Sequence, residues 1–257
     1  MTETRERQPP KNWAEFHRSV RLKWLLPFLY ADWLIDWGAY FLSKSSLLEF
    51  LEYCSTFSIL IAVIFYFRDA PERKKLSHYQ AWQVINIAQG KGGSGGRGDA
   101  LHELNEDHVP LVGVDLSEAF FQNLDLKQAD LRRSKFHNTD LKSANLTQSN
   151  LEQSALVSAN LRSCRLVGVN FSQATLFDSD LSGAVLTGCD FSQADLRNTD
   201  MTGIVDWKSI AGIKLADIHG IQNAPDGFVS WAISKGALDL ESDKDWDAAI
   251  QKDAAGK

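Results

Sequence analysis

The sequence has few cysteines and no excess of positive charge. Its three cysteines, Cys54, Cys164 and Cys189, form no CxxC pair and are too sparse in 257 residues for a disulfide scaffold. They therefore indicate a reducing environment. The formal net charge of −6 argues against direct binding to nucleic acid, because that binding needs a basic surface to displace counterions. We expect no nucleic-acid ligand.

Sequence motifs for metal binding and catalysis are also missing. The nearest approach to a zinc-protease helix, residues 102–106, has Glu106 where the second histidine should stand. The glycine-rich stretch 90–98 contains GxSxG, but no predicted strand precedes it and no Lys-Ser or Lys-Thr pair follows it. We interpret this stretch as a flexible hinge. We predict no catalytic residue, no metal site and no cofactor, and hence a protein that is not an enzyme.

The sequence does contain a five-residue period. A large apolar residue occupies every fifth position from Leu111 to Met201. A second series of mostly small residues, such as Ala129 and Ser134, lies two positions before these centres. A period of five fits neither a helix nor a strand, so the chain must turn regularly, with both series inside and the other three positions outside. The predicted repeat centres are Leu116, Phe121, Leu126, Leu131, Phe136, Leu141, Leu146, Leu151, Leu156, Leu161, Leu166, Phe171, Leu176, Leu181, Leu186, Phe191 and Leu196.

The residues before the centres carry a family resemblance. Ala129-Asp130-Leu131, Ala144-Asn145-Leu146 and Ala194-Asp195-Leu196 resemble the A(D/N)LXX pattern of pentapeptide-repeat proteins. The resemblance implies an all-β solenoid, a right-handed quadrilateral β-helix with four pentads per coil. At about 4.8 Å per coil, its roughly five coils would form a rod about 23 Å long. Terminal caps are expected because a stacked solenoid exposes open edges.

Changes in composition divide the chain into six predicted segments. They are a basic tail (1–23), a membrane anchor of one or two helices (24–75), a helical neck and N-terminal cap with the hinge 90–98 (76–108), the β-helix (109–204), a C-terminal cap (205–240) and a polar tail (241–257).

The surer part of the predicted anchor is Leu47–Phe67. Its 21 residues would span about 31 Å as a helix, which matches the hydrocarbon core of a bilayer. Basic residues follow it at Arg68, Arg73, Lys74 and Lys75 and favour the cytoplasmic side. We therefore expect a protein of the cytoplasmic membrane, in contact with lipid, whose repeat domain faces the cytoplasm.

A second apolar stretch, Trp24–Leu42, contains Pro27, Asp32 and Asp36, and it either spans the membrane or lies in the interface. Acidic residues inside a membrane often mark an ion pathway. The neighbouring tryptophans and tyrosines favour the simpler interpretation of an interfacial anchor beside hydrated carboxylates.

Three functional hypotheses follow, of which the first is a membrane-anchored scaffold that binds an unidentified protein partner. The second, implied by the family resemblance, is a DNA-mimicking protein that interacts with a topoisomerase. The surface fits the role of a DNA mimic poorly, because its charge is mixed: residues 109–204 carry eleven acidic and eight basic side chains. The third is a regulator or subunit of a membrane transport system, which would use Asp32, Asp36 and oligomerisation of the anchor. The candidate interaction surface consists of Arg132, Arg133, Lys142 and Arg162.

Overall fold

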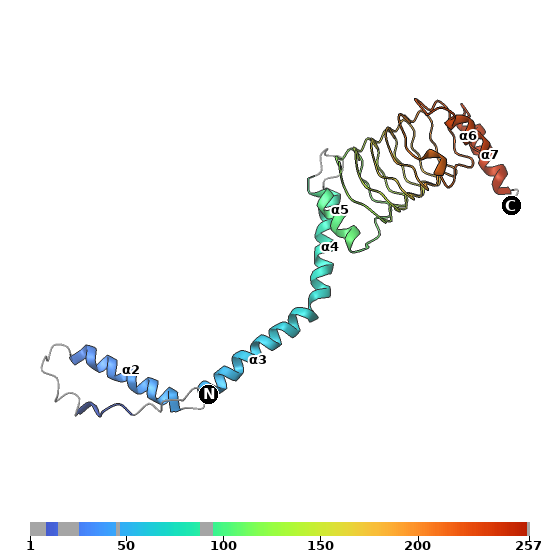
Figure 1. Cartoon of the computed structure of the whole chain (residues 1–257). Helices are drawn as coiled ribbons and strands as arrows, with labels where there is room; N and C mark the ends of the chain where they lie inside the picture. Colours follow the sequence, from blue (N-terminus) through green and yellow to red (C-terminus); the bar gives the residue numbers. More distant parts are fainter. Residues whose placement is uncertain (1–8, 15–25, 45–46, 88–94, 256–257) are drawn as a thin grey trace. The chain divides into compact units, whose positions relative to one another are not determined.

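The computed structural model describes residues 9–14, 26–44, 47–87 and 95–255 (Figure 1). Most of the predicted basic tail and the first part of the predicted hinge lie outside the described residues. The chain divides into two compact units, residues 1–73 and 74–257.

The first unit contains the helices α2 (Leu26–Lys44) and α3 (Leu47–Arg68). Aromatic rings line one face of α2, with 5.8 Å between the ring centroids of Tyr30 and Trp33. Trp13 packs edge-on against Tyr30 at 4.8 Å, and the Trp33 indole donates a hydrogen bond to the Lys11 carbonyl at 2.8 Å. Residues 9–14 therefore pack against the aromatic face of α2.

The predicted membrane span is not supported as a single crossing helix. Among the described residues, no one helix is both long enough and apolar enough to cross a bilayer. The bent pair Tyr53–Arg68 and Ala70–Ile87, whose axes differ by 46°, meets the requirement of length and composition only when both halves are taken together.

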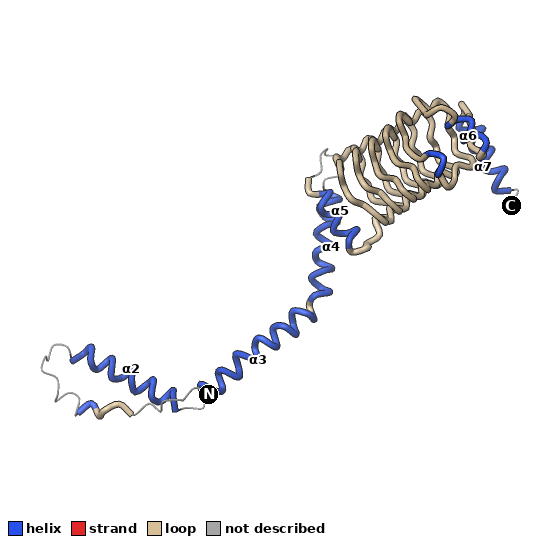
Figure 2. The backbone as a smooth tube through the Cα atoms, viewed as in Figure 1, coloured by secondary structure: helices blue, strands red, loops and turns tan. Residues whose placement is uncertain are grey.

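The second unit is a coil that repeats every 20 residues. Parallel bridges join Asp115 to Lys135, and the same separation continues up to the bridge between Val185 and Val205. The Leu116 amide donates to the Lys135 carbonyl at 2.8 Å, and the Lys135 amide donates to the Val114 carbonyl at 2.9 Å. This ladder confirms the predicted four pentads per coil. Each rung is one residue long, so Figure 2 draws the coils as loops.

The inside of the coil holds both predicted series. Every predicted repeat centre is buried, and the rings of Phe171 and Phe191 stack at 5.1 Å. Most polar members of the small series donate to neighbouring carbonyls: Ser149 donates to the Leu146 carbonyl at 2.7 Å, and Cys164 donates to the Leu141 carbonyl at 2.9 Å. The buried Ser179 hydroxyl is an exception and has no hydrogen-bond partner among the residues that the structure describes. Burial raises the pKa of the Cys164 thiol to about 12. Ser149 and Cys164 are therefore packing residues whose polar groups are satisfied.

Each corner of the coil needs a residue in the left-handed region. Ser143 and Gln148 have φ values of 60° and 59° at equivalent corner positions. This conformation costs a residue other than glycine about 1–2 kcal/mol. Bonds between coils offset the cost, because the Ser143 amide donates to the Arg162 carbonyl at 2.8 Å.

Helices α4 (Ala70–Ile87) and α5 (Arg97–Glu106) lie at the N-terminal end of the coil (Figure 1). Arg97 is fully buried. Its guanidinium donates to the Asp115 carbonyl at 2.7 Å and lies 5.6 Å from the centre of the Phe121 ring. Residues 97 and 98, which sequence analysis assigns to the hinge, thus begin a helix that is fixed to the first coil.

The ladder continues beyond Ile204, where sequence analysis ends the repeats. A short 3-10 helix, Trp207–Ser209, widens one corner, and Asp195 then pairs with Asp217 across 22 residues. Helix α6 (Phe228–Ser234) closes the C-terminal end with Phe228 buried. Helix α7 (Asp243–Ala255) occupies most of the predicted polar tail, and its Trp246 indole donates to the Leu215 carbonyl at 2.8 Å.

Candidate functional site

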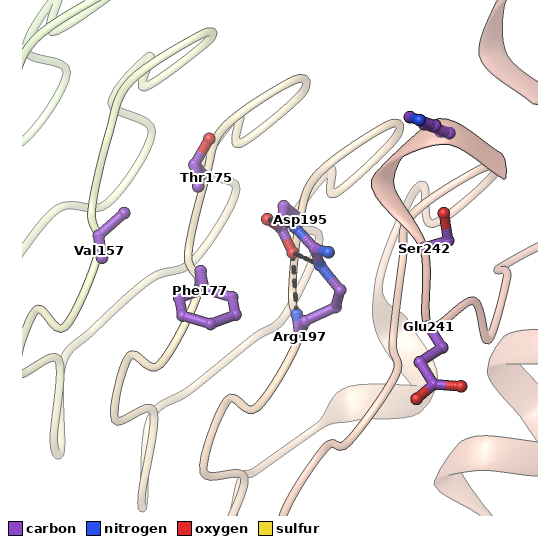
Figure 3. Close-up of a pocket in the computed structure, with 8 residues that line it drawn as sticks. Val157, Thr175, Phe177, Asp195, Arg197, Glu241 and Ser242 are labelled. Carbon is purple, nitrogen blue, oxygen red and sulfur yellow. Dashed lines mark hydrogen bonds and ion pairs between the residues drawn. The ribbon is translucent and has the colours of Figure 1, made fainter. Parts of the chain in front are cut away.

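An open pocket of about 790 Å³ lies on one side of the β-helix, beside the segment that leads into α7 (Figure 3). We call this side, whose repeat centres include Leu156, Leu176 and Leu196, the groove side. The pocket is lined by Val157, Thr175, Phe177, Asp195, Arg197, Glu241, Ser242 and Lys244.

The apolar part of the pocket comes from two outward residues. Val157 and Phe177 each follow a repeat centre and stand on neighbouring coils, where both are half-buried. The guanidinium of Arg197, on the next coil, lies 5.6 Å from the centre of the Phe177 ring. A cation at this distance is attracted by the face of an aromatic ring. The column therefore presents an apolar surface that ends at the Arg197 guanidinium.

Arg197 is held in place by acidic residues. Its Nε donates to Asp195 Oδ1 at 2.9 Å, and a terminal nitrogen donates to Asp195 Oδ2 at 2.7 Å. Asp217 Oδ2 lies 3.8 Å from the same Nε. Paired hydrogen bonds of this kind fix the plane of a guanidinium. Figure 3 shows Asp195 and Arg197 joined in this way beside Phe177.

Asp217 connects the pocket to the last coil. Its Oδ1 accepts hydrogen bonds from the His219 amide at 3.1 Å and the Leu240 amide at 3.3 Å. The side chain is fully buried. Burial raises the pKa of this carboxyl group above its ordinary value, and the Arg197 charge opposes that shift. The carboxylate thus helps to hold residue 240, just before the pocket wall, against the coil.

The second wall comes from the C-terminal segment. Glu241, Ser242 and Lys244 line it and carry both signs of charge. The eight lining residues include neither histidine nor cysteine. In the described part of the chain, no group of three or more His, Cys, Asp or Glu side chains could hold a metal ion. The arrangement is suited to binding an apolar group that has polar neighbours.

The structure does not unite the four residues of the predicted interaction surface. Arg132 and Arg133 follow the centre Leu131, whereas Lys142 and Arg162 follow centres on the side two pentads further along. Two pentads are half a coil, so the two pairs lie on opposite sides of the β-helix.

Two of the predicted residues already have acidic partners. Arg132 makes two hydrogen bonds to Asp130, at 2.8 and 2.7 Å. Arg162 contacts Asp180 at 3.4 Å. The pocket is not among the features predicted from the sequence, although one signal of it is present there: Val157 and Phe177 are outward apolar residues 20 positions apart.

Comparison with known proteins gives a family match. A family profile described as "Pentapeptide repeats" matches residues 111–148, 144–183 and 164–203, with eight copies. No curated protein sequence matches the chain.

Several solved structures are similar to part of this chain. One is the pentapeptide repeat protein Rfr23 from the cyanobacterium Cyanothece, with 23% identity over 45% of this chain and 86% of that chain, and a TM-score of 0.30. HetL from the cyanobacterium Nostoc, involved in heterocyst differentiation regulation, has 27% identity over 46% of this chain and 56% of its own, with a TM-score of 0.33. QnrB1, a plasmid-mediated fluoroquinolone resistance protein, has 17% identity over 57% of this chain and 90% of its own, with a TM-score of 0.22.

The buried carboxyl group of Asp217 predicts an unusual dependence of stability on pH. Because its folded pKa is raised, its favourable contribution is complete below the unfolded pKa, near 3.8, and is lost as pH rises through the folded value. Asp217→Asn keeps the Oδ1 acceptor but carries no charge. We expect this variant to gain stability relative to the wild type as the pH rises from about 3 to about 7, measured by urea unfolding.

Asp130→Asn is the control of opposite sign. Hydrogen bonds from Arg132 lower the pKa of Asp130, so this variant should lose stability relative to the wild type near neutral pH and approach it as the pH falls. A difference between Asp217→Asn and the wild type that does not change with pH would contradict the assignment.

Proposed function

Because residues 111–203 belong to the pentapeptide-repeat family, whose members fold as right-handed quadrilateral β-helices, we propose that the chain is a non-catalytic interaction scaffold. The groove-side pocket binds a segment of a protein partner, and α3 associates with a membrane. The observation that supports the first part is the pair of outward apolar residues, Val157 and Phe177, beside a fixed arginine.

The chemistry of the pocket indicates the kind of segment that it would bind. An apolar side chain of the partner would cover Val157 and Phe177, while polar groups beside it would meet Glu241 and Lys244. Aromatic and arginine side chains often dominate the energy of protein interfaces. Arg197 is already oriented by Asp195, so little of its freedom would be lost on binding.

The distribution of charge favours this scaffold over a DNA mimic. A mimic needs a continuous acidic surface. Here, however, acidic residues on three sides are paired with neighbouring arginines, in the contacts Asp130–Arg132, Asp180–Arg162 and Asp195–Arg197. Part of the negative charge is therefore neutralised in local ion pairs.

Membrane association is supported by the surface of α3. Residues 59–67 are all apolar and exposed, and because consecutive helical residues point about 100° apart, this run covers every direction around the helix axis. A helix that is apolar all round requires an apolar environment, and lipid supplies one. The basic residues that follow α3 favour the cytoplasmic side. The exposed apolar residues include Ile59, Leu60, Ile61, Val63, Ile64 and Phe65, with exposed fractions of 46–68%.

The described residues do not support the hypothesis of a membrane transport system to the same degree. Asp32 and Asp36 are both exposed on α2, as expected for hydrated carboxylates beside the aromatic face formed by Tyr30, Trp33 and Trp37. We therefore retain the interfacial interpretation of α2.

A photocrosslinking amino acid placed at residue 177 tests whether the pocket binds a partner. The experiment uses the full chain in the cells that naturally produce it. We expect crosslinks to one partner of defined mass, and we expect Val157→Asp to reduce them at least about tenfold, because a charge would then occupy the apolar surface. The matched control is residue 167. Like Val157, Val167 is a half-buried outward valine that follows a repeat centre, but it lies on the opposite side of the coil. Equal crosslinking from positions 167 and 177 would refute the pocket as the binding site.

Charged residues in α3 test membrane association. Each lysine placed in the centre of a hydrophobic helix costs about 2.5–3.5 kcal/mol of insertion free energy, so Ile61→Lys combined with Ile64→Lys should weaken vesicle binding by at least about a hundredfold. The measurement is co-flotation of the full chain with lipid vesicles. Val205→Lys changes an exposed apolar residue of the β-helix and should have no effect. Unchanged flotation of the double variant would rule out this role of α3.

A further inference from the structure

Helix α4 has two apolar faces, and only one of them is covered. Ala81 and Ile85 are buried in the core at the N-terminal end of the β-helix. Leu76, Tyr79 and Ile87 lie on the other face, with exposed fractions of 59%, 72% and 67%. Together with Gln83, these three residues follow the spacing i, i+3, i+7 and i+11, which places them in one stripe along the helix. We call this stripe the outer face of α4.

The inner face of α4 is firmly attached to the β-helix unit. Lys74 and His78 contact the two carboxylate oxygens of Asp107 at 2.5 and 2.7 Å, and Ser77 donates to Glu103. The hydrogen bonds from Lys74 and His78 lower the pKa of Asp107. Trp82 packs against the same core. A ligand bound to the outer face would therefore hold the whole β-helix unit and not a mobile linker.

We propose that the outer face of α4 binds a lipid surface and thereby fixes the β-helix unit at the membrane. This inference rests on the proposed association of α3 with lipid. It adds a second and separate contact, made by residues of the β-helix unit itself.

Chain length and residue type favour lipid as the occupant. Leu76 follows Arg68, the last residue of α3, by eight positions, which corresponds to about 12 Å along a helix. This is short enough for residue 76 to remain near the headgroups. Tyr79 is an interfacial residue type, and the exposed Lys75 can reach anionic headgroups. Glu72, also exposed, would lie in the hydrated outer layer.

A second copy of the chain is a weaker candidate. Three partly exposed side chains offer on the order of 400 Å², whereas a stable protein interface buries about 800 Å² on each partner. The stripe is also interrupted by Gln83, which would have to be desolvated in a dry helix pair. A lipid interface tolerates a glutamine because its outer layer is wet.

Lipid-borne quenchers test this contact in the full chain. In a Cys54→Ser background, a single new cysteine carries an environment-sensitive fluorophore at Gln83→Cys on the outer face, Ile61→Cys in α3 or Glu106→Cys on α5. Cys164 and Cys189 should stay unlabelled, because both are buried and their thiol pKa values are raised to about 12. The vesicles contain phosphatidylcholine, phosphatidylglycerol and a brominated phosphatidylcholine.

We expect quenching at residues 61 and 83 to exceed that at residue 106 by about threefold or more, since only the first two would lie at lipid depth. Adding Leu76→Glu with Ile87→Glu should remove quenching at residue 83 and leave it at residue 61. Circular dichroism checks that this variant is folded.

Other outcomes would overturn the inference in distinguishable ways. Quenching at residue 61 without quenching at residue 83 rejects the outer face as a lipid contact and leaves the proposed function intact. Quenching at neither residue rejects membrane association altogether. Efficient disulfide formation between unlabelled Gln83→Cys copies in vesicles would assign the outer face to a second copy of the chain instead.

Discussion

The backbone hydrogen bonds between successive coils are the constraint on which the rest of the structure depends. A five-residue period allows no helix and no extended strand, so each pentad pairs its amides and carbonyls with the pentads 20 residues before and after it. The pairing succeeds only if every corner turns alike. This requirement explains why residues such as Ser143 and Gln148 accept the left-handed conformation and why the inward positions admit only two kinds of side chain.

The same constraint leaves the outward positions free to carry function. Because outward side chains do not take part in the ladder, Val157, Phe177 and Arg197 can form a mixed surface without disturbing the coil. The ends are less free, since the last rungs must be covered. At the C-terminal end this covering brings a fully buried carboxylate, Asp217, against Arg197. It also places the segment before α7 beside the groove side, where it completes the pocket.

The sequence predicts the interior of the β-helix well because a regular period in the sequence arises from a regularly repeating backbone. It fails where the period fails. The 3-10 helix Trp207–Ser209 adds two residues to one coil. The five-residue register is broken there, so the sequence does not show that the ladder continues. The pocket wall at 241–244 has no period at all. Arg132 and Lys142 are only ten positions apart in sequence, yet half a coil separates them. The predicted membrane anchor stays a prediction, since the apolar surface of a helix does not identify the molecules that cover it.

The central claim is that a 20-residue register stacks the coils, and engineered disulfides measure it directly. Residues 155 and 175 are paired on neighbouring coils, and the strand spacing of about 4.8 Å lies within the Cα separation of a disulfide. In a background without the native cysteines, Ala155→Cys with Thr175→Cys should form a disulfide under mild oxidation. Ala155→Cys with Asn170→Cys, which places the cysteines on adjacent sides of the coil, should not. Crosslinking of the second pair in preference to the first would contradict the four-pentad coil and the groove side defined by it.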